Sequence, residues 1–494
     1  MVLRREILKA FGLLGASTAL LQSNPLQALQ AIADKQHVAR DYKGLVCIML
    51  NGGNDAFNMV FPDKAHPEYH NYLHTRQTLA VPNYVNNPQY LANKGDVRYS
   101  KQLLPIMLRD LAGQQHALNF HPGMEGLHAL TVDKQVAVIA NTGVLIEPGN
   151  RDEFKHNRKR KPAFLFAHNQ QRKAVYSGIG DNNVTTGWAG NMTELASLKY
   201  DSKGGLKQGG ISAVLPMGIS FHGTNQWLRG QDSMGAVLAP GKPGKIIGLD
   251  EKGNKRQQAR TTTVQALQSL PSDDVLIHVM RGKLTSAQDL ATVLTQLWAK
   301  NSKALAKIDA FFDEDKLSRQ LAAVAQTILL RESLGMQRQV FMVELGGFDT
   351  HAGQIDKQPL LLTALSRAIS SFQQALAFLA LTQQVTTFTA SDFGRTLTSN
   401  GSGTDHGWGS HQFVIGGAVQ GGLYGKWPVM LRGGVDDYRS GRLLPTTSLT
   451  QVNASLAAWF GASTDEVNIL FPNLNLFPSG GVPLFQRVKN KDFV

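Results

Sequence analysis

Cysteine is almost missing from the sequence: a single residue, Cys47, occurs among 494. One thiol cannot form a disulfide within the chain, so a disulfide scaffold is excluded. Cys47 lies inside the apolar run LVCIML, where a thiol is more often a small buried side chain than a nucleophile. We therefore expect Cys47 in the hydrophobic core.

Long hydrophobic runs are missing as well. Beyond the N-terminal stretch, no segment approaches the roughly 18 consecutive apolar residues of a membrane-spanning helix. The hydrophobic content of 42% and charged content of 18% are typical of an ordinary globular protein. We expect no stable transmembrane span.

Acidic residues are the minority among the charges. The chain has 37 Asp and Glu against 50 Lys and Arg, a net charge of +13, and part of the excess lies in KHNRKRK, Lys155–Lys161. Such a run can contact nucleic acid or an anionic surface. Because no nucleic-acid-binding module accompanies it, we interpret it as a solvated loop and expect no nucleic-acid partner.

The first residues, LRREILKAFGLLGASTALLQ, have the pattern of an export signal. Arg4 and Arg5 precede Leu8 and Lys9, and a modestly apolar stretch of small residues follows. This order is typical of a twin-arginine signal, with a basic amphipathic helix as the alternative. We predict a signal peptide and linker over residues 1–35, the twin-arginine export machinery as a partner, and a periplasmic location.

The rest of the chain alternates short apolar runs with helical patterns. Near-continuous apolar runs favour parallel strands buried on both faces, and the segments 287–312 and 360–384 have helical spacing. The alternation predicts one α/β domain over 36–494, with helices on both faces of a mostly parallel central sheet. A stretch rich in Gly, Ser and Lys, at about 190–260, is interpreted as an irregular insertion within it. The predicted strands are 44–50, 135–141, 339–345, 385–391 and 412–418.

Polar side chains follow several of these strands. Ligands of open α/β sheets bind at the carboxyl ends of the strands, and carboxylates with imidazoles are usual ligands of a divalent metal such as Zn²⁺ or Mn²⁺. No single motif is specific, and an isolated loop His is as often solvated as it is a ligand. The combination predicts a polar site. Its candidate residues are Asp55, Asp349, His351, Asp392, Arg395, Asp405, His406 and His411.

Five segments carry a resemblance to a known family. They are LNGGNDAFNMVFP, GGFDTHAGQ, DFGRT, GTDHGWGSHQFVIGGAVQGG and GRLLPTTSLTQVNASLAAWFG. Together with the twin-arginine start, they resemble the bacterial family called domain of unknown function 1501. That family is similar in fold to the alkaline phosphatase and sulfatase superfamily. The resemblance implies a one-metal or two-metal site at the carboxyl edge of the sheet, and a hydroxyl or modified-Cys nucleophile.

The resemblance also implies roles for single residues. Asp55 would take the place of the first-strand metal acid, and Asp349 with His351 that of the Asp and His after a middle strand. Asp392 matches a later acid of the superfamily, whereas Phe393 stands where a His would be a ligand.

The late His of the superfamily is matched by His406, with His411 as the alternative. Asp405 and His406 could together supply, from the loop, the ligand that is missing at Phe393.

The nucleophile of the superfamily has no obvious counterpart. The resemblance implies Ser-His, as in many relatives, where this chain has Ala167-His168. Alanine has no hydroxyl to attack phosphorus or sulfur. Ser391 and Thr396 are possible substitutes, although Ser and Thr beside strand ends more often cap or turn the chain.

Two functions are compatible with these residues. The first is a metal-dependent hydrolase of phosphate or sulfate esters, in which bound Zn, Mn, Ca or Mg lowers the pKa of a water. In this hydrolase, Arg395 would contact the ester oxygens, and His168 would be the general acid. The alternative for Arg395 is a structural ion pair. The second is a non-catalytic envelope protein that binds a metal or an anionic ligand, as Ala167 and Phe393 favour.

Overall fold

The computed structural model describes residues 42–87, 90, 98, 100–202, 215–244, 253–269, 271 and 273–485. The predicted signal peptide at 1–35 lies outside these ranges. Within them, no helix combines the length and the hydropathy needed to cross a bilayer.

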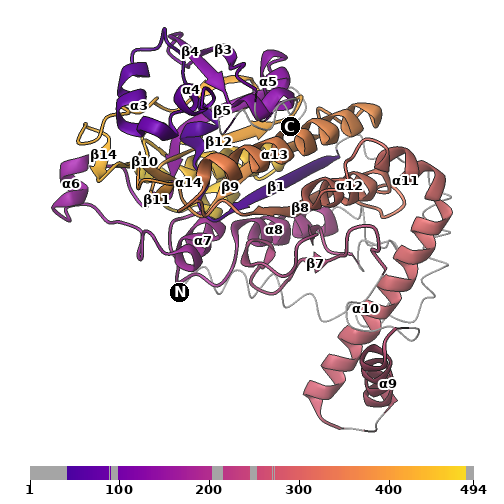
Figure 1. The fold of residues 1–494 in the computed structure, drawn as a ribbon. Coiled ribbons are helices and arrows are strands. Elements are labelled where there is room, and N and C mark those ends of the chain that lie inside the picture. Colours follow the sequence, from indigo (N-terminus) through magenta and orange to yellow (C-terminus); the bar gives the residue numbers. More distant parts are fainter. Residues whose placement is uncertain are drawn as a thin grey trace, which may run out of the picture.

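A nine-stranded sheet forms the centre of the described chain (Figure 1). Its strand order is β13-β5-β12-β9-β1-β8-β6-β7, and β16 pairs with β5. The central strand β1 runs parallel to both of its neighbours, β8 and β9. The predicted α/β class with a mostly parallel central sheet is therefore confirmed. The strands are β1 (Lys43–Asn51), β5 (Val136–Gly143), β6 (Gly218–Ser220), β7 (Ala236–Val237), β8 (Arg338–Gly346), β9 (Val385–Ser391), β12 (Ser410–Ile415), β13 (Gly422–Tyr424) and β16 (Thr447–Ser448).

Strand β12 departs from the expected direction, because it pairs antiparallel with both β9 and β5. The chain leaves β9, forms a two-stranded hairpin of β10 (Arg395–Ser399) and β11 (Thr404–His406), and returns directly to the sheet as β12. A parallel neighbour would need a crossover of a dozen or more residues, usually a helix, to bring the chain back to the other end. The polar hairpin thus replaces the predicted parallel connection.

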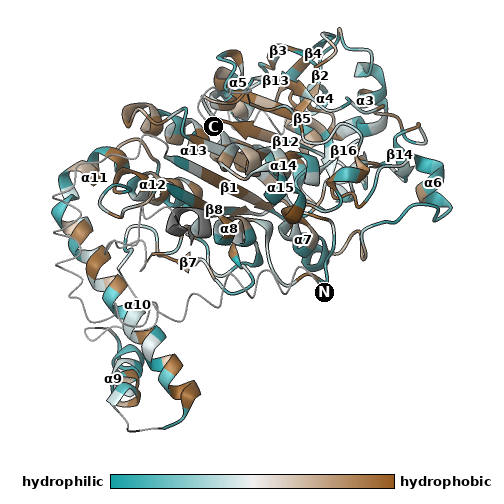
Figure 2. Ribbon diagram, turned by 180° about the vertical axis from the view of Figure 1, so that it is seen from behind, coloured by the Kyte–Doolittle hydropathy of each residue, from teal (hydrophilic) through white to brown (hydrophobic). Residues whose placement is uncertain are grey.

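Two layers of helices cover the sheet because the strands are apolar on both faces. On β1, Val46 and Ile48 pack into the core beneath α5, α12 and α13, whereas Leu45 and Cys47 pack into the core beneath α7, α8 and α14. Figure 2 shows the apolar residues along β1 and β12 in the middle of the molecule. Cys47 is buried, as expected. The helices are α5 (Glu125–Val132), α7 (His168–Ser177), α8 (Trp188–Ser202), α12 (Lys316–Leu329), α13 (Gln354–Phe378) and α14 (Leu449–Phe460).

The remaining elements surround this core. A small antiparallel sheet has the order β2-β4-β3, and β14 pairs with β15. Helices α9 and α10 project from the body (Figure 1), and α10 is buried only near its C-terminal end. The elements are β2 (Val60–Pro62), α3 (Tyr69–Arg76), α4 (Val81–Tyr84), β3 (Leu104–Arg109), β4 (Gln115–Phe120), α6 (Arg151–Lys155), α9 (Lys255–Ser269), α10 (Val275–Lys300), α11 (Ser302–Asp309), β14 (Asp437–Arg439), β15 (Arg442–Leu443) and α15 (Thr464–Leu470).

The stretch at about 190–260 holds more regular structure than the sequence pattern indicates. In its described parts it includes most of α8, the strands β6 and β7, and the start of α9. Strand β6 pairs parallel with β8 and extends the central sheet. Strands of two or three residues are too short to give a recognisable alternation, so composition alone makes the segment look irregular.

Candidate functional site

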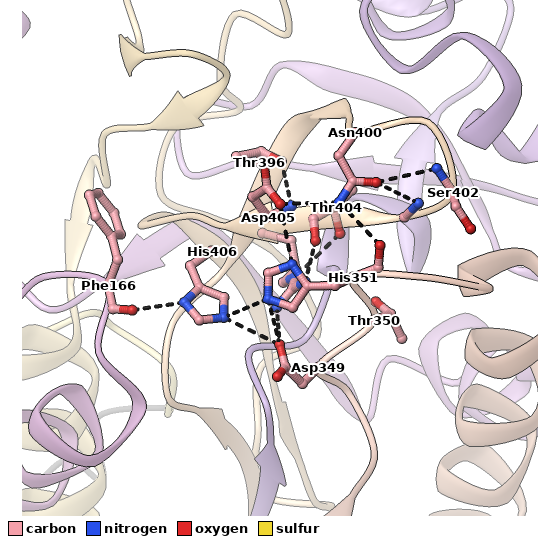
Figure 3. A network of polar contacts seen from close by, with 12 residues as sticks. Phe166, Asp349, Thr350, His351, Thr396, Asn400, Ser402, Thr404, Asp405 and His406 are labelled. Carbon is pink, nitrogen blue, oxygen red and sulfur yellow. Dashed lines mark hydrogen bonds and ion pairs between the residues drawn. The ribbon is translucent and has the colours of Figure 1, made fainter.

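The site lies where several strands end. Asp349 follows β8, Asp392 follows β9, and His406 is the last residue of β11. Because the carboxyl ends of parallel strands meet at one edge of the sheet, β8 and β9 deliver their acids to the same place. The β10–β11 hairpin then brings His406 back over that edge (Figure 3).

Asp349 is the centre of a cluster that also contains His168, His351, Arg395 and His406. Its Oδ1 atom lies 2.7 Å from Nη1 of Arg395, 3.1 Å from Nε2 of His351 and 3.3 Å from Nε2 of His406, and its Oδ2 atom lies 3.5 Å from Nε2 of His168. The Asp349 side chain is 47% exposed, so the cluster opens to solvent. One ligand atom each of His168, Asp349 and His406 lies within 4.8 Å of the other two, close enough to share one metal ion.

His168 is oriented by a buried carboxylate. It is the first residue of α7, and its Nδ1 donates to Oδ2 of Asp392 across 2.7 Å. This hydrogen bond raises the pKa of His168. A carboxylate only accepts, so Nδ1 carries the hydrogen and Nε2 of the neutral ring keeps its lone pair toward Asp349.

His406 is oriented in the same way by a backbone carbonyl. Its Nδ1 donates to the carbonyl oxygen of Phe166 across 2.8 Å, which again leaves the lone pair on Nε2 (Figure 3). Burial lowers the pKa of His406 and so favours the neutral ring. A metal-bound His characteristically donates its other ring N–H to a carboxylate or a carbonyl. His168 and His406 both have this arrangement, and the residues present therefore fit a divalent metal.

His351 stands beside these two rings and is paired with Asp405. Its Nδ1 donates to Oδ1 of Asp405 across 3.2 Å, and its Nε2 lies 2.9 Å from Nε2 of His406. Partial burial opposes ionisation of Asp405, but hydrogen bonds from Asn400 and His351 hold its pKa below the usual value. The pair is thus an imidazole oriented by an ionised carboxylate, an arrangement typical of a proton-transfer residue.

Arg395 is part of the structural frame of the site. Its side chain is fully buried, and Nη1 donates to Asp349 and to the carbonyl oxygen of Gly52. Nε and Nη2 donate to the hydroxyl and carbonyl oxygens of Thr404. Burial opposes the ionised form of Asp349, but the guanidinium outweighs it and lowers the pKa of that carboxyl. The donors predicted to contact an ester are therefore engaged by the protein.

Four of the predicted metal residues do not converge on Asp349. Asp392 holds His168, and Asp405 holds His351. The buried carboxylate of Asp55 accepts from Arg76 and from Nε2 of Gln354, and so forms an internal ion pair. The difference arises because Asp55 faces α3 and α13, which the sequence pattern after β1 does not reveal.

His411 is the fourth predicted metal residue that lies away from Asp349. Its ring stacks on Trp427 with the centroids 4.7 Å apart, and its Nδ1 accepts from the backbone N–H of Asn141. Burial lowers the pKa of His411 to about 3, which keeps the ring neutral. It lies at the start of β12, inside the sheet, and is held as a core residue.

Phe393 packs against two of the clustered imidazoles, which also contact each other. The centre of its ring lies 4.7 Å from that of His168 and 4.6 Å from that of His406. Phe393, Asp392 and His411 line a cavity of about 30 Å³, which has room for about two water molecules. The solvent-exposed side of the cluster is at Asp349 and His351, whose side chains are 47% and 44% exposed.

The two candidate hydroxyl nucleophiles are occupied. Oγ of Ser391 donates to the carbonyl oxygen of Leu50 and accepts from the N–H of Asn54, both across 2.8 Å. Oγ1 of Thr396 donates to the carbonyl of Thr398 and accepts from the N–H of Asp405. The Ser391 hydroxyl stabilises the turn after β1, and the Thr396 hydroxyl stabilises the β10–β11 hairpin, as Ser and Thr commonly do beside strand ends.

Sequence reasoning assigned His168 to proton transfer, whereas the structure places its Nε2 atom among the candidate ligands. The sequence signal for a ligand at His168 was its position at the start of a helix, beside Ala167, where the superfamily has its nucleophile. The carbonyl of Phe166 had no signal at all, because a backbone oxygen carries no residue type. Asn400, which holds Asp405 across 3.1 Å, was also missed, since it reads as an ordinary turn residue.

Comparisons with solved structures give distant likenesses. The structure of a protein named Ps i-CgsB is 10% identical, with a TM-score of 0.34, and the match covers 87% of this chain and 74% of that one. A complex of Ps i-CgsB with k-i-k-neocarrahexaose gives 11% identity, 87% and 74% coverage, and a TM-score of 0.31. A protein from the glycosaminoglycan metabolism of Bacteroides thetaiotaomicron is 9% identical, with a TM-score of 0.29, and the match covers 85% of this chain and 73% of that one.

The comparison with curated proteins found no match. Residues 42–460 match the model of a family described as Protein of unknown function (DUF1501). The match extends from the first described strand to the end of α14, so it includes every residue of the cluster. Because the matched residues make up most of the chain, the protein belongs to the DUF1501 family.

Proposed function

We propose that the protein is a metal-dependent hydrolase of phosphate or sulfate esters, exported by the twin-arginine pathway to the periplasm. The observation that carries the proposal is the orientation of His168 and His406, whose Nδ1 atoms are bonded elsewhere and whose Nε2 atoms face Asp349. The choice of ester rests on the resemblance of the sequence motifs to the phosphatase and sulfatase superfamily. The export route rests on the N-terminal pattern around Arg4 and Arg5.

The proposed metal ligands are His168, Asp349 and His406. Two imidazoles and one carboxylate form the kind of three-residue set that catalytic zinc sites use, with a further position left open. The set also suits Mn²⁺, whereas Ca²⁺ and Mg²⁺ prefer oxygen ligands throughout. A divalent cation held there would supply the positive charge that lowers the pKa of a nearby water molecule.

The proposed proton-transfer residue is His351, which replaces His168 in that role. His351 takes a proton at Nε2 from the attacking water, whose oxygen bonds to the phosphorus or sulfur as the bond to the leaving oxygen breaks. The Nδ1–H of His351 remains bonded to Asp405, whose negative charge stabilises the resulting imidazolium. The same proton can then pass to the leaving oxygen of the ester. Arg395 keeps Asp349 ionised and fixes its orientation.

A second candidate function is binding without turnover, as an envelope protein. One observation favours it: Arg395, Ser391 and Thr396 all form hydrogen bonds within the protein. The two hydroxyls are therefore not available to attack a substrate, and the guanidinium is not available to bind one. In this case the cluster would hold a metal together with an anionic ligand.

Hydrolysis of 4-nitrophenyl phosphate and 4-nitrophenyl sulfate tests the proposal, with protein loaded with Zn²⁺ or Mn²⁺ and the same protein treated with EDTA. We expect release of 4-nitrophenol that is lost with EDTA and with His406→Gln. The matched control is His278→Gln, which changes an exposed His on α10. If the metal-loaded protein hydrolyses neither ester, the proposed hydrolase activity is contradicted and the binding function is favoured.

A further inference from the structure

Arg442 is a half-buried cation next to the cluster with unused donor groups. It begins β15, and its Nε donates to the carbonyl oxygen of His406 across 2.9 Å. The carbon at the centre of its guanidinium lies 4.8 Å from the centre of the Phe166 ring. Within the described chain, no acceptor is paired with its Nη1 or Nη2 atoms.

These contacts fix Arg442 relative to a proposed metal ligand. Phe166 accepts a hydrogen bond from Nδ1 of His406 and stacks against Arg442, while Arg442 holds the backbone of His406. Three residues from three separate segments thus form a closed unit. A guanidinium held at one end, with its other two nitrogens unpaired, is pre-organised for a ligand with two parallel acceptor oxygens.

The carboxylates of Asp405 and Asp437 lie near enough to attract Arg442, but neither is paired with it. Asp405 precedes His406 in the chain, but its carboxylate accepts from Asn400 and His351. Within the described ranges, Arg442 forms no ion pair. Arg395 differs in this respect, because all three of its nitrogens are bonded to the protein.

We propose that Arg442 binds the anionic group of the substrate. This group is a tetrahedral oxyanion, and two of its oxygens accept hydrogen bonds from Nη1 and Nη2. This inference rests on the proposed function, and it adds the residue that selects a phosphate-like or sulfate-like group. Arg442 therefore takes the role that the sequence assigned to Arg395.

The test is calorimetric binding of inorganic phosphate and, separately, inorganic sulfate to zinc-loaded protein, with Arg442→Lys and Arg442→Ala compared to the wild type. Lysine keeps the charge but cannot reproduce the two parallel donors. We expect Arg442→Lys to weaken the preferred anion by about tenfold or more, with the zinc content unchanged. The matched control is Arg439→Ala, which removes an exposed arginine at the position paired with Arg442 on β14 and should change the affinity by less than about twofold.

Two results would overturn the inference: unchanged affinity in both Arg442 variants, or no binding of either anion by the wild type. The two proposals fail separately. If the protein binds the anion through Arg442 but hydrolyses no ester, the proposed hydrolase activity is wrong and the anion site stands. If the protein hydrolyses an ester but its anion affinity does not depend on Arg442, the hydrolase activity stands and the anion site is wrong.

Discussion

Nε2 of His351 lies 2.9 Å from Nε2 of His406, although the Nδ1 atom of each ring already donates to an acceptor elsewhere. Two neutral rings in these tautomers point lone pairs at each other, which is unfavourable unless a proton or a cation lies between them or beside them. Asp349, 3.1 Å and 3.3 Å from the same two atoms, adds negative charge at this point. The cluster is therefore built to hold positive charge.

The two imidazoles should respond differently to replacement. We expect His351→Gln to keep the metal and to lose activity by about 100- to 10,000-fold, because it removes the proton-transfer residue. His406→Gln should lose the metal itself. Metal content and kcat, measured on the same preparations, separate the two; a His351 variant that loses metal as readily as the His406 variant would make His351 a ligand instead.

The Asp55–Arg76 pair should behave as a structural element. Both side chains are fully buried, so Asp55→Asn leaves an uncompensated charge in the core and should cost about 3–5 kcal/mol of unfolding free energy. The folded variant should still bind metal with wild-type stoichiometry. Urea unfolding and metal analysis check this, and Asp349→Asn is the comparison: it should lose metal, and it should cost less stability than Asp55→Asn because the Asp349 carboxylate is half exposed. Loss of metal in the Asp55 variant would restore the role first assigned to it.

Asp392 should act on the metal through His168. Asp392→Asn keeps an oxygen for the Nδ1–H of His168 but removes the negative charge, so metal affinity should fall by about 10- to 100-fold. Competition with a fluorescent chelator measures this. Asp465→Asn, an exposed acid in the first turn of α15, is the control and should leave the affinity unchanged. Equal affinities in all three proteins would remove Asp392 from the site.

Buried His121 should make the protein sensitive to acid. Burial lowers its pKa to about 3, below the value of about 6.5 in an unfolded chain, so the unfolded state binds the extra proton first as the pH falls. The stability contributed by this group is complete above about pH 6.5 and is lost progressively between about pH 6.5 and pH 3, with about 2 kcal/mol gone at pH 5.

His121→Asn removes this term while its oxygen still accepts from the N–H of Gly123. Unfolding free energies at pH 7.5 and pH 5 should therefore differ by about 2 kcal/mol less in the variant than in the wild type. The same pH dependence in both proteins would show that His121 is protonated without cost.

The sheet could be predicted from the sequence because its strands are nearly continuous apolar runs. The run at 44–50 corresponds to β1, Lys43–Asn51, and 385–391 corresponds to β9, Val385–Ser391. Strand direction is not contained in such a run, so β12 was expected to be parallel. Its antiparallel pairing follows from the β10–β11 hairpin, whose strands are polar and too short to recognise.

The site was predictable only in part, for a related reason. Asp349, His351 and His406 follow or end strands, and the topology brings them together. Asp55 follows a strand equally well, but its partner Arg76 lies on α3, and no local pattern announces a buried ion pair. Contacts made by a backbone carbonyl, such as that of Phe166, leave no mark on the sequence.

The central claim is that His168, Asp349 and His406 hold a divalent metal. Elemental analysis by mass spectrometry, on protein purified without chelator, tests it directly beside an Asp349→Ala/His406→Ala double variant. We expect about one equivalent of Zn or Mn in the wild type and none in the folded double variant. Wild-type protein that holds no metal after resupply with both ions, or a double variant that keeps it, would show that these three residues are not a metal site.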